Sequence, residues 1–316
     1  MRRNDGVPEE LVSRMFQGAA YDGENYQPYA PSYAVHPDTA RRLSEGGLLG
    51  LEQFDPDSED VFTSEVIRAL CEPFLNGKKD YGDMPLMAYQ LWNTLDWRKP
   101  LASPEVAQRF INKLGEEVME TIEAYQTLQR DSQSEEAKEE FISELGDTLF
   151  CATAAATILG ADIERGTAVQ LQEIYGNADR YPTLSHIDNK VNAGLNRRDE
   201  LYPDGQYPYW IWSLANHEDT WEGDVSPPAI LPVLCRPLID AMMPQAEADL
   251  VVGVGSPYRD AVESFAGKLW VYAAFWGRYY ADIPLSGVIK KNMAKISGRV
   301  VQGSLDDKTK RTSDTL

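Results

Sequence analysis

The stretch GEEVMETIEAYQTLQRDSQSEEAKEEFISELGD begins and ends with carboxylates close beside apolar residues. Glu116, Glu117 and Glu120 form the first group, and Glu144 and Asp147 form the second. Residues three apart on an α-helix face the same way, so Glu117 pairs with Glu120 and Glu144 pairs with Asp147. The pattern predicts two acidic helix faces, each about one turn long.

Two such faces can form a metal site if their helices lie side by side. The short polar connection between them favours an antiparallel pair, which brings the four carboxylates together. Their repulsion raises their pKa values and lowers stability, and Mg²⁺ relieves it by taking oxygen ligands. A bound Mg²⁺ polarises phosphoryl oxygens. The alternative is a solvated acidic face, the commoner meaning of an isolated EExxE, and the neighbouring apolar residues weaken it.

Helical patterns carry both acidic groups. The segment SPEVAQRFINKLGEEVMETIEAYQTL predicts a long amphipathic helix with Ser103 as N-cap and Pro104 in the first helical position. A second helix is predicted over SEEAKEEFISELGDTLFCATAAATILG, whose apolar end should be buried, and a third begins at DIERGTAVQLQEIY. Further helices are expected at SEDVFTSEVIRALCEPFL and PLMAYQLWNTL. Strand signals are scarce, so the fold class is predicted to be all-α.

Composition excludes several classes of function. The 316 residues carry a net charge of −20, which argues against a nucleic-acid polymer as partner. The three cysteines form no CxxC pair, so a reduced, cytoplasmic location is expected rather than a disulfide framework or structural zinc site. The N-terminus lacks the apolar core of a signal peptide, and the longest apolar run is too short to span a bilayer. No membrane partner is therefore expected.

Three segments recur in the same order, which predicts an internal duplication. LGEEVMETIEA (114–124) aligns with LIDAMMPQAEA (238–248), and YQLWNTL aligns with YWIWSLA (209–215). GDTLFCATAAATILGADI aligns with GKLWVYAAFWGRYYADI, so that Gly146 meets Gly267. The predicted organisation is an irregular or disordered N-terminal arm (1–57), a first unit with a preceding helix (58–195), a second, diverged unit (196–303) and a flexible tail (304–316).

EEVME followed by ELGD resembles the EExxE and ExxD motifs of the MazG-like all-α nucleoside triphosphate pyrophosphohydrolases. YQLWNTL and the ending VIKKNMAKISGRVVQGSLDD resemble the flanking helices of that family, so the resemblance covers residues 85–307. It implies Mg²⁺-dependent cleavage between the α and β phosphates, giving a nucleoside monophosphate and pyrophosphate. Family members are four-helix units that assemble as dimers or larger oligomers. This chain would be a pseudo-dimer of two such units, with further homo-oligomerisation left open.

The resemblance also implies roles for individual residues. The metal, Mg²⁺ with Mn²⁺ as an alternative, would be bound by Glu117, Glu120, Glu144 and Asp147. Glu116 matches the first motif position and would be a ligand or support one. The catalytic residues would be Glu116, Glu117 and Lys295.

The last helix and the aromatic residues each have two interpretations. By the same resemblance, Asn292, Lys295 and Arg299 would contact the substrate phosphates; the alternative is the ordinary preference of Lys and Arg for a helix C-terminus. Trp92 and Trp270 are candidates for stacking on the base, with an aromatic core as the alternative.

The two copies keep different parts of the motif set. Ala241, Pro244 and Lys268 stand in the second copy where the first has Glu117, Glu120 and Asp147, and only Asp240, opposite Glu116, stays acidic. The first copy lacks the Asn-x-x-Lys-x-x-x-Arg pattern of the last helix. One composite site per chain is therefore expected. Two alternatives stay open: a phosphoribosyl-ATP pyrophosphohydrolase-like enzyme, and a non-catalytic helical bundle that senses nucleotides or binds a partner protein.

Overall fold

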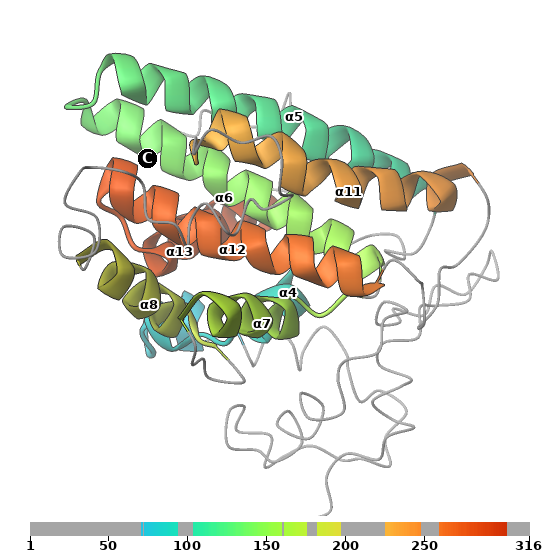
Figure 1. Cartoon of the computed structure of the whole chain (residues 1–316), viewed down its shortest axis with the longest axis horizontal. Coiled ribbons are helices and arrows are strands. Elements are labelled where there is room, and N and C mark those ends of the chain that lie inside the picture. Colours follow the sequence, from blue (N-terminus) through green and yellow to red (C-terminus); the bar gives the residue numbers. More distant parts are fainter. Residues whose placement is uncertain are drawn as a thin grey trace, which may run out of the picture.

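The structure is a computed structural model of the whole chain (Figure 1). It describes residue 71 and residues 73–93, 104–159, 161–175, 182–196, 225–247 and 259–301. The predicted N-terminal arm, the tail, the segment YWIWSLA and most of the helix predicted at SEDVFTSEVIRALCEPFL lie outside these residues.

The described residues are helical and contain no extended strand, which confirms the all-α prediction. The elements in chain order are η2 (Tyr81–Asp83), α4 (Leu86–Trp92), α5 (Pro104–Arg130), α6 (Glu135–Ile158), α7 (Ile163–Tyr175), α8 (Leu184–Asn196), α11 (Pro227–Glu247), α12 (Arg259–Ala281) and α13 (Leu285–Val301).

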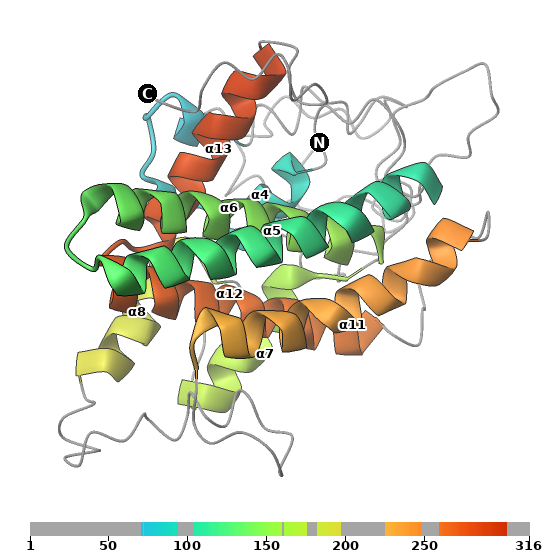
Figure 2. The same cartoon turned by 90° about the horizontal axis from the view of Figure 1, so that it is seen from above.

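The two helices that carry the acidic groups, α5 and α6, form an antiparallel hairpin (Figure 2). Pro104 is the first residue of α5, as predicted. Ser134 caps α6, because its side-chain oxygen accepts a hydrogen bond from the backbone N–H of Ala137 at 3.2 Å. The polar connection between the two helices is short enough to leave them packed along their lengths. α11 lies along α5, and α12 packs against both α6 and α11, so these four helices form the centre of the protein.

The apolar half of α6 is the inner wall of the core. All its residues from Leu145 to Ile158 are buried, as the sequence predicted for this segment. Among the described residues, α6 is also the one helix long and apolar enough to cross a membrane, but 89% of its apolar stretch is buried inside the protein. Burial of that kind is typical of a core helix.

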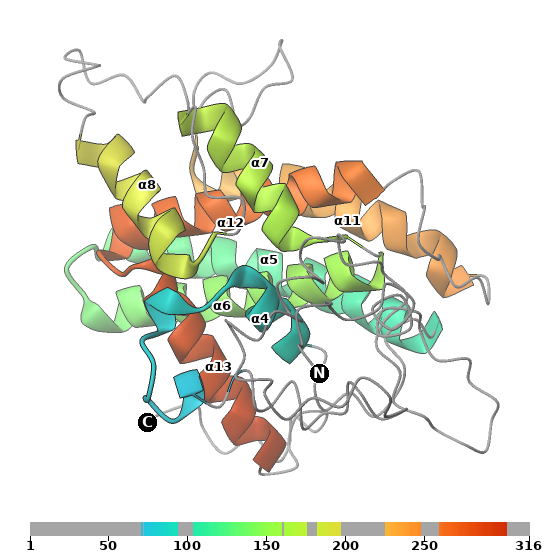
Figure 3. The same cartoon turned by 90° about the horizontal axis from the view of Figure 1, so that it is seen from below.

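Each half of the chain contributes one helix that packs across a helix of the other half. α13 crosses α6 at a steep angle (Figure 2), and α7 packs on α12 (Figure 3). The two aligned glycines lie at these crossings: a Cβ added to Gly146 would be 3.0 Å from Cβ of Asn292 in α13, and one added to Gly267 would overlap the backbone of Gly166 in α7. The equivalence of the two positions is consistent with a duplication.

Buried carboxylates fix the crossing helices in place. Asp188 of α8 accepts hydrogen bonds from the backbone N–H groups of Leu285 (2.7 Å) and Ser286 (3.3 Å), so it caps α13 from another helix. Glu263 of α12 accepts the backbone N–H of Asp162 at 3.0 Å and forms an ion pair with Arg165 of α7. The hydrogen bonds of Asp188 fix the start of α13, and those of Glu263 fix the start of α7.

The glycine crossing can be tested with two alanine substitutions. Gly267→Ala should lower the free energy of unfolding by at least about 2 kcal/mol, because a methyl group there must displace the backbone of α7. Gly115→Ala is the matched control: its Cβ meets nothing within 4 Å, and alanine should stabilise α5 by roughly 0.5–1 kcal/mol. Urea denaturation followed by circular dichroism measures both. Equal effects of the two substitutions would contradict the close packing of α7 on α12.

Candidate metal centre

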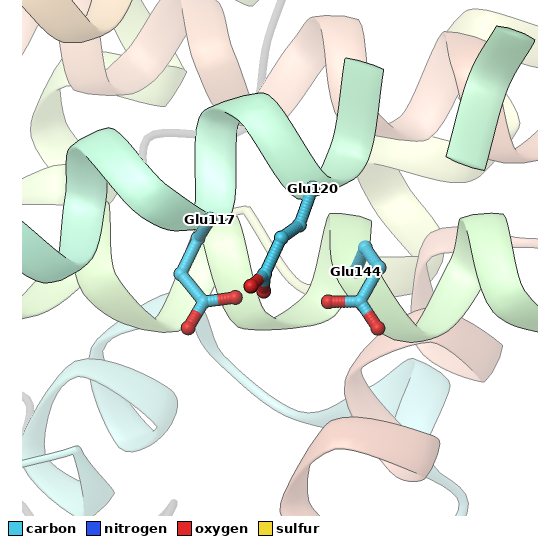
Figure 4. A group of neighbouring side chains, drawn as sticks. All are labelled: Glu117, Glu120 and Glu144. Carbon is cyan, nitrogen blue, oxygen red and sulfur yellow. The ribbon is translucent and has the colours of Figure 1, made fainter. Parts of the chain in front are cut away.

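Three glutamates of α5 and α6 come together where the two helices face each other. One carboxylate oxygen each of Glu117, Glu120 and Glu144 lies within 4.8 Å of the others. Figure 4 shows the three carboxylates lying side by side, those of Glu117 and Glu120 coming from α5 and that of Glu144 from α6. The spacing of three residues places the first two on one helix face, and the antiparallel hairpin brings the third opposite them. These three predicted metal ligands are therefore neighbours in the structure.

Glu117 is the buried member of this cluster. It is 4% exposed, whereas Glu144 is partly buried and Glu120 is exposed. Oε2 of Glu117 has no hydrogen-bond partner among the described residues. A buried carboxylate oxygen without a partner is destabilising, and a cation beside it would offset this. The unpartnered oxygen is an observation independent of the clustering, and it fits a bound metal ion.

Asp147, the fourth predicted ligand, is 7% exposed and faces α13. The side-chain amide of Asn292 donates a hydrogen bond to its Oδ1 at 2.9 Å, and the ammonium of Lys295 donates to its Oδ2 at 2.9 Å. Lys295 also donates to the hydroxyl of Ser143 at 3.0 Å. Both Asp147 oxygens are thus occupied by residues predicted to contact phosphates. The crossing of α13 brings these residues beside the acidic motif, although they lie more than 140 positions later in the chain.

Tyr89 of α4 orients Asn292. Its buried hydroxyl donates to Oδ1 of Asn292 at 2.9 Å, which leaves the amide nitrogen to face Asp147. Burial, with the charge of Asp147 nearby, raises the pKa of Tyr89 well above its ordinary value, so its hydroxyl keeps its proton. The sequence predicted a helix here, with Trp92 as a base-stacking candidate, but nothing in the sequence indicated this hydrogen bond.

Lys113 is a second residue that the sequence analysis missed. Its ammonium lies 2.6 Å from Oε1 of Glu117 and 3.4 Å from Oε2 of Glu116. Both glutamates follow Lys113 by about one turn of α5. Glu116 itself is largely solvated, with half its side chain exposed. The signal available in the sequence was a lysine four residues before a buried glutamate, which is a common spacing for a helical ion pair.

The remaining predicted site residues have different surroundings. Trp92 and Trp270 are both buried, and their ring centroids lie 5.6 and 5.3 Å from that of Tyr89, which places both rings in the aromatic core. Arg299 belongs to α13, but its side chain lies outside the described residues.

The second half carries no matching acidic cluster among the described residues. Lys268, aligned with Asp147, is partly buried on α12, and burial lowers its pKa while the charge of Glu173 on α7 opposes that change. Asp240 pairs with Arg236 at 2.6 Å on the exposed side of α11. The charge pattern at the second crossing is therefore reversed relative to the first.

Burial controls the protonation of the cluster. Burial, reinforced by the charge of Asp147, raises the pKa of Glu117 to about 7, although the ion pair with Lys113 acts in the opposite direction. Burial also raises the pKa of Glu144, with Lys295 opposing the shift. Without a metal ion the cluster therefore retains protons at a pH where ordinary carboxyl groups have lost them.

This raised pKa predicts a pH-dependent effect of Glu117→Gln on stability. Between the ordinary value of 4.5 and about 7, the folded protein holds a proton that the unfolded chain has lost, so the free energy of unfolding falls as pH rises through this window. Without metal, Glu117→Gln should match the wild type near pH 4.5 and exceed its stability at pH 8 by on the order of 1–3 kcal/mol.

Urea denaturation in the presence of a chelator measures this difference. Glu123→Gln, at an exposed position of the same helix, is the matched control and should leave the stability at pH 8 close to that of the wild type. A stability difference between Glu117→Gln and the wild type that stays constant from pH 4.5 to pH 8 would contradict the raised pKa.

Comparison with protein-family models, with curated proteins and with solved structures finds no match to this chain. The resemblance to the MazG-like pyrophosphohydrolases accordingly stays a hypothesis, and the function is proposed from the chemistry of the side chains.

Proposed function

We propose that this chain hydrolyses a nucleoside triphosphate to the monophosphate and pyrophosphate, using a divalent metal ion, at one composite site. The observation that carries the proposal is the meeting of two kinds of groups. Three glutamates suited to a metal ion lie together on α5 and α6, and Lys295 and Asn292 of α13 contact Asp147 on the same helix as Glu144. Carboxylates that hold a metal beside a cation that binds phosphate are the groups that phosphoanhydride cleavage requires.

The residues present fit a hard divalent cation. All three clustered groups are carboxylates, the donors that Mg²⁺ and Mn²⁺ prefer over softer metals, and Oε2 of Glu117 has no other partner in the described residues. Glu117, Glu120 and Glu144 would hold the ion. When bound, it would polarise a phosphoryl oxygen and supply a hydroxide nucleophile near neutral pH.

The position of Lys295 beside Asp147 suits it to bind a substrate phosphate. Its ammonium neutralises Asp147, and a triphosphate arriving at the site offers it a second anion. Lys295 is partly exposed, so its long side chain can turn toward a phosphate without opening the core. Asp147 would then be released as a further metal ligand while Asn292 still holds its other oxygen. Substrate binding and completion of the metal site would thereby be coupled.

A non-catalytic nucleotide sensor is the second candidate. The occupation of both Asp147 oxygens by Asn292 and Lys295 favours it, because a site held in this state would bind metal and nucleotide without completing the ligand set. Turnover decides between the two functions: a sensor binds the nucleotide and leaves it intact. A panel that includes phosphoribosyl-ATP separates the related pyrophosphohydrolase from enzymes acting on ordinary nucleoside triphosphates.

Metal-dependent pyrophosphate release tests the enzyme function. Release should require Mg²⁺ or Mn²⁺ and should fall by roughly a hundredfold or more in Glu117→Gln and in Asp147→Asn, because each change removes a charge from the site that stabilises the transition state. Both substitutions are nearly isosteric, so the fold should persist. Glu123→Gln is the exposed control on α5 and should keep full activity. Unchanged rates in both site variants would contradict the proposal.

Substitution of Lys295 tests whether α13 contributes to the same site as the glutamates of α5 and α6. Lys295→Ala should raise KM for the triphosphate and lower kcat, because a cation near the phosphates is lost. Lys291→Ala is the matched control, since it removes the same charge from the preceding turn of α13, where Lys291 pairs with Glu139 at 3.6 Å. Calorimetric titration should give one triphosphate per chain. Two triphosphates per chain, or equal effects of the two lysine substitutions, would contradict a single composite site.

A further inference from the structure

The two oxygens of Glu117 have different surroundings, although the residue is almost fully buried. Oε1 accepts a hydrogen bond from the ammonium of Lys113 at 2.6 Å, whereas Oε2 has no partner among the described residues. A carboxylate is planar, so holding one oxygen limits the directions in which the other can point. With Oε1 occupied, Oε2 is the oxygen that remains for the cluster with Glu120 and Glu144. Figure 4 shows the carboxylates of these three glutamates side by side.

The position of Lys113 makes it suited to this task. It lies four residues before Glu117 on α5, so the two side chains are neighbours on the same helix face. About a quarter of its side chain is exposed, and its ammonium also contacts the solvated Glu116. The lysine thus extends from the protein surface to the buried carboxylate and is held between two glutamates.

We propose that Lys113 is a positioning residue of the metal site: it holds Oε1 of Glu117 so that Oε2 is presented to a divalent cation. The inference rests on the proposed metal site but not on the nature of the substrate. Groups that hydrogen-bond a metal ligand orient it, and their loss generally weakens metal binding.

This role predicts a result opposite to that of simple electrostatics. Lys113 is a positive charge in direct contact with a metal ligand, and it therefore repels a cation bound to that ligand. If charge alone mattered, neutralising Lys113 would strengthen metal binding. If Lys113 positions Glu117, the same change weakens binding, because the carboxylate can then turn away from Glu120 and Glu144. The direction of the change in affinity separates the two effects.

The experiment is a direct titration of the metal-free, full-length protein with Mn²⁺, without nucleotide, followed by calorimetry and by the paramagnetic resonance of free Mn²⁺. Lys113→Met should weaken Mn²⁺ binding by about 10–100-fold. Lys113→Arg keeps a charged donor within reach of Glu117 and should restore most of the affinity. Lys138→Met is the matched control: Lys138 forms a similar ion pair with Glu135 at 2.7 Å in the first turn of α6, so its loss removes the same charge outside the cluster.

Each result has a clear meaning. Binding by Lys113→Met that is as tight as in the wild type, or tighter, would overturn the positioning role while leaving the metal site intact. Lys113→Arg binding as weakly as Lys113→Met, or an equal loss in Lys138→Met, would also overturn it. No Mn²⁺ binding by the wild type would overturn the proposed function and this inference with it. Thermal melting in chelator checks the fold, and Lys113→Gln replaces any variant that fails to fold.

Discussion

A buried carboxylate needs hydrogen-bond partners, and at Asp147 those partners come from the other end of the chain. The amide of Asn292 and the ammonium of Lys295 occupy its two oxygens, so α13 must cross α6 at this level. The crossing in turn requires a small residue, which is Gly146, and a fixed start for α13, which Asp188 provides by capping it. Removing one partner would leave a charge in the core, so the elements that surround Asp147 are mutually dependent.

The second crossing shows what the same architecture does without the acidic cluster. Lys268 stands at the position aligned with Asp147, and its charged neighbour on the crossing helix α7 is Glu173. An attractive pair can be kept when both signs are reversed, so the two helices can still pack favourably. A metal site of the kind proposed for α5 and α6 would not survive the reversal, because a lysine offers no ligand to a divalent cation. A duplicated chain could therefore lose one of two sites and keep the packing of both halves.

The features that could be predicted from the sequence were those that depend on residues close together in the chain. The start of α5 followed from Pro104, and that of α6 was predicted one residue early, at Ser134, which is its N-cap; such starts depend on a few neighbouring residues. The meeting of Glu117, Glu120 and Glu144 followed from helical spacing and a short connection. Contacts between distant segments could not be derived in this way: the hydrogen bond from Tyr89 to Asn292 joins residues 203 positions apart. Such a bond depends on the angle at which helices cross, and no local pattern encodes that angle.

Charge balance links the observations at the site. Five carboxylates surround the two ammonium groups of Lys113 and Lys295, namely Glu116, Glu117, Glu120, Glu144 and Asp147, so full ionisation leaves three negative charges, most of which one divalent cation would neutralise. Without metal, part of this balance comes from protons, since burial raises the pKa of Glu117 to about 7 and also raises that of Glu144. A metal ion and protons would therefore compete for the same oxygens, and metal binding near neutral pH would release protons. A cation at this site would offset the repulsion between carboxylates that protons relieve in its absence, which would be an electrostatic reason for gathering carboxylates at the edge of an apolar core.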